Sequence, residues 1–198
     1  MFTGIIEKVG EVAEIKPTAS GFRLRLNTVL SPELTPGDSL AVNGVCLTVV
    51  AADADGVHMD VSPETVRVSA LGTLKRGSPV NLERPMLATG RVDGHFVQGH
   101  VDATGTIEEI RRDGDSWWMT VKYPPSMAAL IVRKGSIAVD GVSLTVAGVD
   151  DKRFDVQIIP FTWSHTSLRF DKVNDLVNLE FDLIGKYVLR AMDVARKP

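Results

Sequence analysis

The sequence predicts an all-β fold with two similar antiparallel domains in tandem, followed by one helix. The segment Ser39–Val49 (SLAVNGVCLTV) returns 97 residues later as Ser136–Val146 (SIAVDGVSLTV), so the chain contains one unit twice. Both copies read as short alternating runs of apolar and polar residues between turn residues, which is typical of antiparallel strands. After Asp182 the apolar residues recur at helical spacing instead.

The repeat covers whole domains and not one short motif. At the same offset, Pro63, Thr65 and Leu71 correspond to Pro160, Thr162 and Leu168, and Val80–Glu83 corresponds to Val177–Glu180. At the front, Gly4 and Gly10 correspond to Gly99 and Gly105, with an offset of 95 that one short insertion explains. We therefore expect domains at residues 1–94 and 95–183 and a helix at residues 184–198.

The first copy shows the strand pattern well. Its alternating runs are Phe22–Leu26, Ser39–Val42, Val45–Val50, Val57–Val61 and Val80–Leu82, and its turn clusters are Thr35–Asp38, Ala54–Gly56 and Lys75–Pro79. This pattern fits a small barrel or a small sandwich in each half. We prefer a closed barrel, because closure removes exposed strand edges.

Helical pieces are expected at three places. Pro63–Leu71 follows Ser62, which can cap it, and residues 126–131 make Pro125–Val132 rich in helix formers. The third is an amphipathic helix whose apolar residues are Ile184, Tyr187, Val188, Ala191, Met192 and Ala195. Because this helix lies outside the repeat, its apolar face serves either self-association or packing on its own barrel, and the pattern favours neither.

Composition excludes several classes of function. The net charge of -3, the pI near 5.8 and the scattered basic residues argue against a nucleic-acid partner. The apolar runs are too short for a membrane span and the N-terminus lacks the features of a signal peptide, so we expect a cytoplasmic protein. A single cysteine excludes an internal disulfide, and the four histidines show no ligand spacing, so we predict no metal.

Differences between the copies single out candidate residues. Asn43-Gly44 and Asp140-Gly141 are turn pairs that favour tight hairpins, and we assign them mainly to folding. Cys46 and Ser143 occupy equivalent positions, with Thr48 and Thr145 two residues later on the same strand face, where they could line a ligand site. A lone thiol in an apolar strand is more often a small buried side chain.

His100 is a titratable group present in one copy only, because Ile5 stands at its position in the first copy. For His100, Ser143, Lys134 and Asp182, a structural or solvated role is the commoner alternative to catalysis. Trp117, Trp118, Trp163 and Phe161 could stack on an aromatic ligand, although packing is the commoner task of such side chains.

Several motifs in register resemble those of the riboflavin synthases, a family of duplicated lumazine-binding proteins. The motifs are Met1–Glu7 (MFTGIIE), Asn43–Val49 (NGVCLTV), Gly94–Val101 (GHFVQGHV) and Asp140–Val146 (DGVSLTV). The resemblance spans essentially the whole chain. It implies two six-stranded antiparallel Greek-key barrels and a C-terminal helix that helps to assemble a homotrimer.

The activity implied by this resemblance is a dismutation without an external cofactor. Two molecules of 6,7-dimethyl-8-ribityllumazine exchange a four-carbon unit, which gives riboflavin and 5-amino-6-ribitylaminouracil. In the family the active site lies between the N-terminal barrel of one subunit and the C-terminal barrel of its neighbour. Lumazine synthase is a further partner that the resemblance implies.

The resemblance also implies two sets of substrate-binding residues. The first comprises Gly4, Ile5, Ile6, Ser39, Cys46, Leu47, Thr48, Asp60, Val61, Ser62, Pro63, Glu64 and Thr65. The second comprises Gly99, His100, Val101, Lys134, Ser143, Leu144, Thr145, Gln157, Ile158, Ile159, Pro160, Phe161 and Thr162. The catalytic hypotheses are that His100 relays protons, that Ser143 and Cys46 orient water or the nucleophile, and that Lys134 and Asp182 tune charge.

Two departures from internal symmetry concern the sugar-binding stretch. Phe161 replaces the Glu64 of the first copy, and Arg169 stands where Gly72 stands. We therefore expect the two pockets to bind the ribityl chain differently.

Two other functions fit parts of the sequence. A non-catalytic carrier would bind lumazine or flavin in the first barrel only, yet the second copy keeps Asp140–Thr145, Pro160 and Thr162 beside His100, which favours the enzyme. A barrel module that binds a protein or an oligonucleotide has only fold analogy in its favour.

Overall fold

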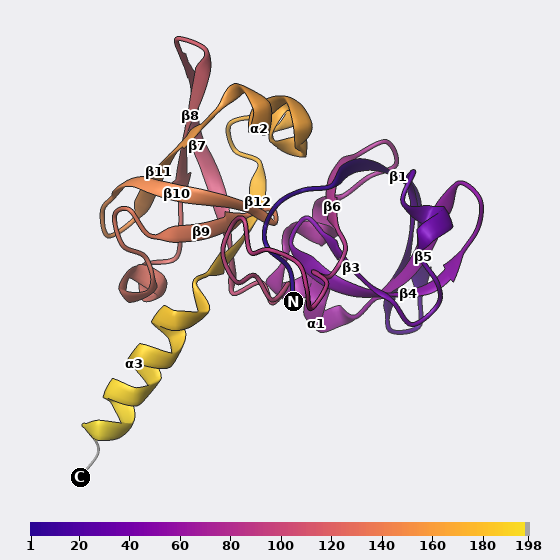
Figure 1. Ribbon diagram of the computed structural model, residues 1–198, viewed down its shortest axis with the longest axis horizontal. Coiled ribbons are helices and arrows are strands. Elements are labelled where there is room, and N and C mark those ends of the chain that lie inside the picture. The colour runs from indigo at the N-terminus through magenta and orange to yellow at the C-terminus, as the bar shows by residue number, and fades with distance from the viewer. Residues whose placement is uncertain (197–198) are drawn as a thin grey trace.

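The computed structural model describes residues 1–196 and confirms the tandem barrels (Figure 1). The first barrel closes in the strand order β1-β2-β5-β4-β3-β6. Its strands are β1 (Lys8–Thr18), β2 (Gly21–Asn27), β3 (Ser39–Val42), β4 (Val45–Ala52), β5 (Gly56–Val61) and β6 (Pro79–Glu83). Its short helices are η1 (Ser31–Glu33), α1 (Pro63–Val68) and η2 (Ala70–Thr73).

The second barrel repeats this topology. Its strands are β7 (Ala103–Asp113), β8 (Ser116–Lys122), β9 (Ser136–Val139), β10 (Val142–Val149), β11 (Arg153–Ile158) and β12 (Leu176–Phe181). Its helical pieces are η3 (Pro125–Leu130), α2 (Pro160–His165) and η4 (Ser167–Phe170). The closed order β7-β8-β11-β10-β9-β12 is the first order with six added to each number, as expected of a duplication.

Alternation along the strands builds one core in each barrel. In β4, Val45, Leu47 and Val49 are buried, whereas Cys46 and Thr48 point outward. Fully burying an aliphatic side chain of this size contributes about 1.5–3 kcal/mol, so the inward set fixes which face is outside. The alternation read from the sequence is therefore confirmed for this strand.

The short helices differ slightly from expectation. Ser62 caps α1 as predicted, because its side chain accepts a hydrogen bond from Thr65 N. The helix expected at Pro125–Val132 is instead the 3-10 helix η3, which ends at Leu130. In the first barrel, the helical stretch expected to reach Leu71 is broken at Ser69, where η2 begins after an extended residue.

A pseudo-twofold axis passes between the two hairpin turns. Asn43 and Asp140 both have φ of 44°, and each precedes a glycine of positive φ, as tight hairpins require. The turns touch: a Cβ built on Gly44 would lie 2.6 Å from Gly141 N. Two buried amides cross the axis, with Asn178 Nδ2 donating to Asn43 O at 2.8 Å and Asn81 Nδ2 donating to Asp140 O at 2.9 Å. The turn pairs thus fold the hairpins and also join the barrels.

Helix α3 (Leu183–Ala195) projects from the second barrel (Figure 1). Among the described residues, the first barrel has no equivalent helix. Asp182 caps α3, its carboxylate accepting from Ile184 N at 2.9 Å. Its first turn approaches the barrel, where Gly185 lies near Leu130. Its apolar residues Ile184, Tyr187, Val188, Met192 and Val194 are exposed, so its own barrel does not cover this face.

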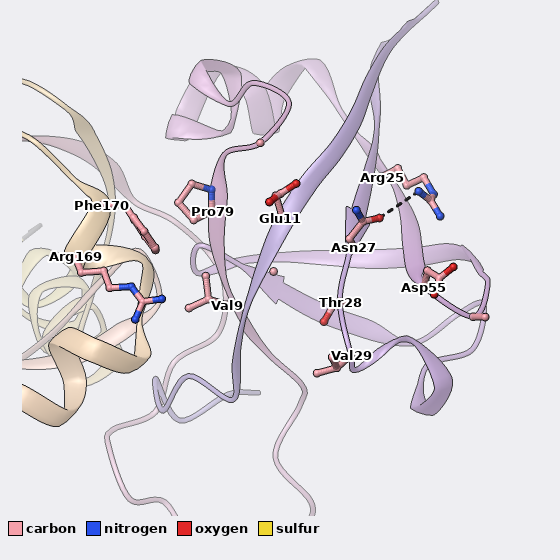
Figure 2. A pocket seen from close by; sticks show the side chains of 13 residues that line it. Val9, Glu11, Arg25, Asn27, Thr28, Val29, Asp55, Pro79, Arg169 and Phe170 are labelled. Carbon is pink, nitrogen blue, oxygen red and sulfur yellow. Dashed lines mark hydrogen bonds between the residues drawn. The ribbon is translucent and has the colours of Figure 1, made fainter.

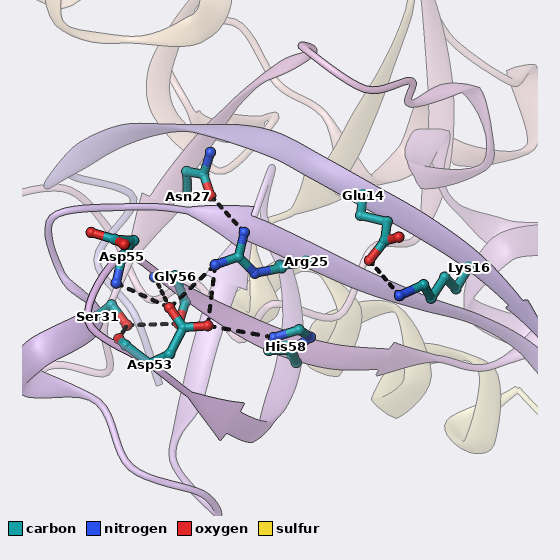
Figure 3. A network of polar contacts seen from close by, with 9 residues as sticks. All are labelled: Glu14, Lys16, Arg25, Asn27, Ser31, Asp53, Asp55, Gly56 and His58. Carbon is teal, nitrogen blue, oxygen red and sulfur yellow. Dashed lines mark hydrogen bonds and ion pairs between the residues drawn. The ribbon is translucent and has the colours of Figure 1, made fainter.

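A polar network closes the far end of the first barrel, at the β4–β5 turn (Figure 3). The carboxylate of Asp53 accepts from the backbone N–H groups of Asp55 and Gly56 and from the guanidinium of Arg25. These donors hold the pKa of Asp53 below its usual range, the Asp55 N–H foremost. His58 belongs to this turn, with Nε2 3.8 Å from Asp53, so we interpret it as structural.

Candidate functional site

In each barrel, two neighbouring strands separate at equivalent places. β4 pairs with β5 from Val49 opposite Met59 onward, through a bulge before Ala51, and the pairing does not extend to Cys46–Thr48. We define the N fork as Cys46–Thr48 of β4 facing Asp60–Val61 of β5. The C fork is the equivalent opening, Ser143–Thr145 of β10 facing Gln157–Ile158 of β11, where pairing starts at Val146 opposite Val156. Backbone groups on such edges can bind the amide edge of a flat ring.

The segments that enter the barrels cross to the opposite forks. Cys46 N donates to Gly99 O at 2.9 Å, and Ser143 N donates to Gly4 O at 2.8 Å. Val101 packs against the core of the first barrel, and Ile6 packs against the core of the second. We expected Gly4–Ile6 beside Cys46 and Gly99–Val101 beside Ser143, and the structure exchanges these two segments. Sequence order hid the crossing, because the two segments pair with each other, Phe2 against Val97, before each enters its own barrel.

Gly4 and Gly99 are required by this crossing. Their φ angles are 75° and 77°, which side-chain-bearing residues rarely adopt. A Cβ on Gly4 would lie 2.7 Å from the Ser143 Cβ, and a Cβ on Gly99 would lie 2.5 Å from the Cys46 Cβ. Both glycines therefore permit contact between a lead-in segment and the opposite fork.

Two buried glutamates hold the crossing segments. Glu83 accepts from Thr3 N at 2.6 Å, from Thr3 Oγ1 at 2.8 Å and from Gly4 N at 3.0 Å. Burial raises the pKa of Glu83 and of Glu180, its equivalent, while the N–H donors that each carboxylate accepts act in the opposite direction. Sequence reasoning missed both as functional residues, although the repeat Val80–Glu83 and Val177–Glu180 contained the signal.

The C fork carries a Ser–His pair. Ser143 Oγ lies 2.8 Å from His95 Nδ1, and His95 is only 8% exposed. Burial lowers the pKa of His95, and the nearby Asp182 carboxylate opposes that shift. His95 Nε2 is buried without a hydrogen-bond partner among the described residues. The neutral imidazole can thus exchange a proton with the Ser143 hydroxyl.

Sequence reasoning missed His95 because it has no counterpart in the first copy. Residue 96 corresponds to Met1 at the offset of 95, so the repeat comparison starts one residue too late. Ser143 and Asp182, both predicted, do come together around it.

Lys134 adopts a backbone conformation that its own residue type disfavours. Its φ is 70°, and the equivalent Gly37 has a φ of 100°. Both residues donate the same bond, Lys134 N to Val146 O and Gly37 N to Val49 O. A non-glycine residue in this region costs about 1 kcal/mol, which supports a role for the Lys134 side chain.

The N fork differs in its side chains. Asp60 pairs with Arg23 at 2.7 Å, and Arg23 lowers the pKa of this half-exposed carboxyl. Glu64 pairs with Arg67 on α1, with an Nε–Oε2 distance of 2.9 Å. His100 is exposed in the segment beside Cys46. The N fork therefore presents two ion pairs, Asp60–Arg23 and Glu64–Arg67, whereas the C fork presents the Ser143–His95 hydrogen bond.

Aromatic rings border the C fork. Trp117 pairs with Ile158 across β8 and β11 and stacks on Trp163 of α2 at a centroid distance of 4.7 Å. Phe161 stacks on His165 at 4.0 Å and is 67% exposed, so its ring is accessible. Trp118 lies under the guanidinium of Arg111 at 5.2 Å.

The other predicted residues divide by burial. Leu47, Val61, Leu144 and Ile158 face the cores, so only their backbone groups are available at the forks. Ser39, Thr65 and Thr162 are partly exposed, and Ile5, Thr48, Ser62, Pro63, Thr145, Gln157, Ile159 and Pro160 are exposed.

One large hollow lies away from the forks. About 930 Å³ in volume, it is lined by Val9, Glu11, Arg25 and Asn27 of the first barrel and by Arg169 and Phe170 of η4 (Figure 2). It contains none of the residues expected to bind substrate, and its two arginines are offset by Glu11 and Asp55. We therefore place the candidate site at the forks, on strand geometry. Among residues 1–196, groups of three or more His, Cys, Asp or Glu side chains arranged to hold a metal are not found.

Comparison with known proteins agrees with this geometry. The lumazine binding domain family matches residues 3–85 and again residues 98–182. The chain is 47% identical over 189 residues to the riboflavin synthase of Actinobacillus pleuropneumoniae, which covers 95% of this chain and 88% of the relative. It is 41% identical over 198 residues to that of Bacillus subtilis, covering 100% of this chain and 92% of the relative.

Solved structures show the same fold. LumP complexed with 6,7-dimethyl-8-(1'-D-ribityl) lumazine superposes with a TM-score of 0.84 at 22% identity, covering 91% of this chain and 99% of that chain. LumP complexed with riboflavin gives 0.85 at 23% identity, with the same coverage. Within the described residues, no helix has the length and apolar character needed to cross a membrane.

Proposed function

Because this chain belongs to the riboflavin synthase family of duplicated lumazine-binding domains, we propose that its two forks each bind one molecule of 6,7-dimethyl-8-ribityllumazine. The chain is an enzyme of the last step of riboflavin biosynthesis. The observation that carries the proposal is the pair of equivalent strand openings, at Cys46–Thr48 and Ser143–Thr145. A reaction between two identical molecules needs two similar sites held in register, because orientation removes much of its entropic barrier.

The forks supply recognition through backbone groups and hydroxyls. Unpaired N–H and C=O groups on the strand edges bind the uracil-like edge of each ring, and Thr48 or Thr145 binds the ribityl chain. Glu64 is available to bind the ribityl chain at the N fork only, because Phe161 stands at the equivalent position of the C fork.

Proton transfer is assigned to the side chains that differ between the forks. The 7-methyl group of one lumazine is acidic, because its carbanion delocalises into the ring, and the substrate is its own electron sink. His95 with Ser143 orients water or accepts a proton at the C fork, and His100 relays protons at the N fork. A four-carbon unit then passes from donor to acceptor, leaving riboflavin and 5-amino-6-ribitylaminouracil.

We further propose that three copies assemble through α3. The exposed apolar residues Ile184, Tyr187, Val188 and Met192 need a cover, and the helix stands away from its own barrel (Figure 1). Assembly brings the N fork of one subunit to the C fork of its neighbour. Association with lumazine synthase and a cytoplasmic location belong to the same proposal.

Turnover with a single substrate tests the reaction. The pure protein, incubated with 6,7-dimethyl-8-ribityllumazine alone, should produce riboflavin, seen by its absorbance. All three tryptophans lie in the second half, so quenching of their fluorescence reports the C fork. Binding of lumazine without turnover would instead support the carrier function.

Mixing two inactive variants tests the intersubunit site. A variant disabled at Ser143 and another disabled at His100 should regain activity when mixed, because one mixed interface contains two intact forks. Light scattering should give the mass of three chains. Variants that fold and exchange subunits but do not complement would place both forks of one site in the same chain.

A further inference from the structure

We propose that Glu180 is a positioning residue that holds the His100 segment of the second half over the N fork. This inference rests on the proposed function, and it names a residue that acts on that site through another. Glu180 lies at the end of β12, in the barrel that does not contain the N fork. His100 lies beside Cys46 of the first barrel, so the connection between the barrels runs through this carboxylate.

The carboxylate of Glu180 binds three consecutive backbone N–H groups. Oε1 accepts from Gln98 N at 2.6 Å, and Oε2 accepts from Gly99 N at 2.9 Å and from His100 N at 3.0 Å. Glu180 is 3% exposed, so water competes little for these bonds. With three donors fixed, the backbone at His100 has little freedom to move relative to β12.

The same segment is held from its other side by the first barrel. The carbonyl of Gly99 accepts from Cys46 N, and Val101 packs against the core of that barrel. His100 therefore stands between a contact to the N fork and a clamp from the second barrel. Its side chain is exposed while its backbone is fixed, which is the arrangement that a positioned proton relay needs.

A second carboxylate completes the clamp. Asp102 Oδ2 accepts from Phe181 N at 2.9 Å and lies 2.6 Å from Lys186 Nζ of α3. In the first half the equivalent Glu7 accepts from Arg84 N and pairs with the Arg84 guanidinium at 2.7 Å. The positive partner is thus Arg84, directly after β6, in the first half, and Lys186 of α3 in the second half. Helix α3 is therefore joined to the His100 segment through Asp102.

The first half supplies a matched control. Glu83 binds Thr3 and Gly4 as Glu180 binds Gln98 and Gly99, but its segment carries Ile5 where the other carries His100. Removing either carboxylate charge loosens an equivalent segment. Only at Glu180 does the loosened segment bear an ionisable side chain.

A double-mutant cycle on the full-length protein tests the proposal. The variants are E180Q, E83Q, H100A and the two double variants, each checked for fold by circular dichroism and for assembly by light scattering. A glutamine amide would direct its NH₂ at N–H donors, so we expect E180Q to lower kcat about tenfold or more with little change in KM. The kcat of E180Q/H100A should match that of H100A within about twofold. The kcat losses of E83Q and H100A should instead multiply in their double variant.

The outcomes separate this inference from the proposed function. Failure of the unmodified protein to turn over would contradict the proposed function, whereas multiplicative effects of E180Q and H100A would overturn only the positioning role. So would a slow E180Q beside a fully active H100A. If E180Q does not fold, K186M replaces it. Lys186 on α3 pairs with Asp102, so removing its ammonium should loosen the same segment. If H100A is too slow for steady-state assay, the same cycle is measured on the single-turnover rate, with enzyme in excess over lumazine.

Discussion

The N fork and the C fork share a backbone but not their chemistry. In both, a lead-in glycine of positive φ accepts from the strand, and a buried glutamate binds the N–H groups around it. The C fork adds the Ser143–His95 pair, a Trp117–Trp163 stack and a lysine in a glycine-like conformation. The N fork has Cys46, the Asp60–Arg23 pair and His100.

On the proposed function, the shared backbone serves binding and the side chains that differ between the forks serve the reaction. Two identical ligands need equivalent backbone edges, and the duplication supplies them. Donor and acceptor must behave differently, and only side chains outside the shared backbone pattern can provide that. The four changes below test this division, from the largest expected effect to the smallest.

The shared contact between the halves can be broken at Gly44. A Cβ there would lie 2.6 Å from Gly141 N, and φ is 74°. We expect Gly44→Ala to lower the free energy of unfolding by about 3–4 kcal/mol, through both clash and backbone strain. Gly37 has a φ of 100° with nothing within 4 Å of its Cβ, so Gly37→Ala should cost only about 1 kcal/mol. Equal losses in urea denaturation would mean that the turns do not press on each other.

The difference in chemistry can be tested at Ser143 and Cys46. Ser143→Ala removes the partner of His95 Nδ1, and we expect kcat to fall about 100-fold. Cys46→Ala, at the equivalent position, should lower kcat less than tenfold, because the thiol serves mainly to pack. Steady-state kinetics and the pH profile measure both. A larger loss at Cys46 would reverse the assignment of the two forks.

The halves also differ in a half-buried acid, Asp171. Burial first, and then the Asp175 carboxylate, raises the pKa of Asp171 to about 7, while the equivalent residue of the first half is Leu74. Burial and Asp171 likewise raise the pKa of Asp140, which corresponds to Asn43. An acid that binds its proton more tightly when folded loses stabilisation as pH rises from about 4 towards 7.

Asp171→Leu should therefore stabilise the protein above pH 7, by about 1–2 kcal/mol, and have less effect near pH 4. Thermal unfolding at pH 5, 6, 7 and 8 measures this slope. Leu74→Asp is the reciprocal change and should make the fall of Tm with rising pH steeper. A variant whose Tm difference from the parent is the same at every pH would contradict the account.

The smallest effect is expected at Lys134. Lys134→Gly relieves a φ of 70°, so stability should be unchanged or higher by up to about 1 kcal/mol, while turnover falls if the ammonium serves the reaction. Asn174 is the control, because its φ is 76° and the equivalent residue of the first half is Gly77. Asn174→Gly should change stability as Lys134→Gly does and leave turnover intact. Equal activity of both variants would remove Lys134 from the site.

The sequence alone determined the architecture, because its signals are local. Alternation in Ser39–Val42 and Val45–Val50, the turn pairs after Val42 and Val139, and the cap at Ser62 each depend on residues a few positions apart. Repetition of these signals predicted two similar domains, each a barrel or a sandwich, and the removal of exposed edges favoured the barrel. Apolar spacing after Asp182 predicted the helix. Candidate residues such as Ser143 followed from comparing the copies.

Only the tertiary structure decided which parts share a site. The crossing that sets Gly99 against Cys46 and Gly4 against Ser143 depends on how two barrels pack about an axis, and neither pairing has a spacing signature. His95 and Glu180 emerged for the same reason, since their partners lie 48 residues away and 80 to 82 residues away. Local alternation specifies strands, whereas long-range hydrogen bonds are set by the packing of completed barrels.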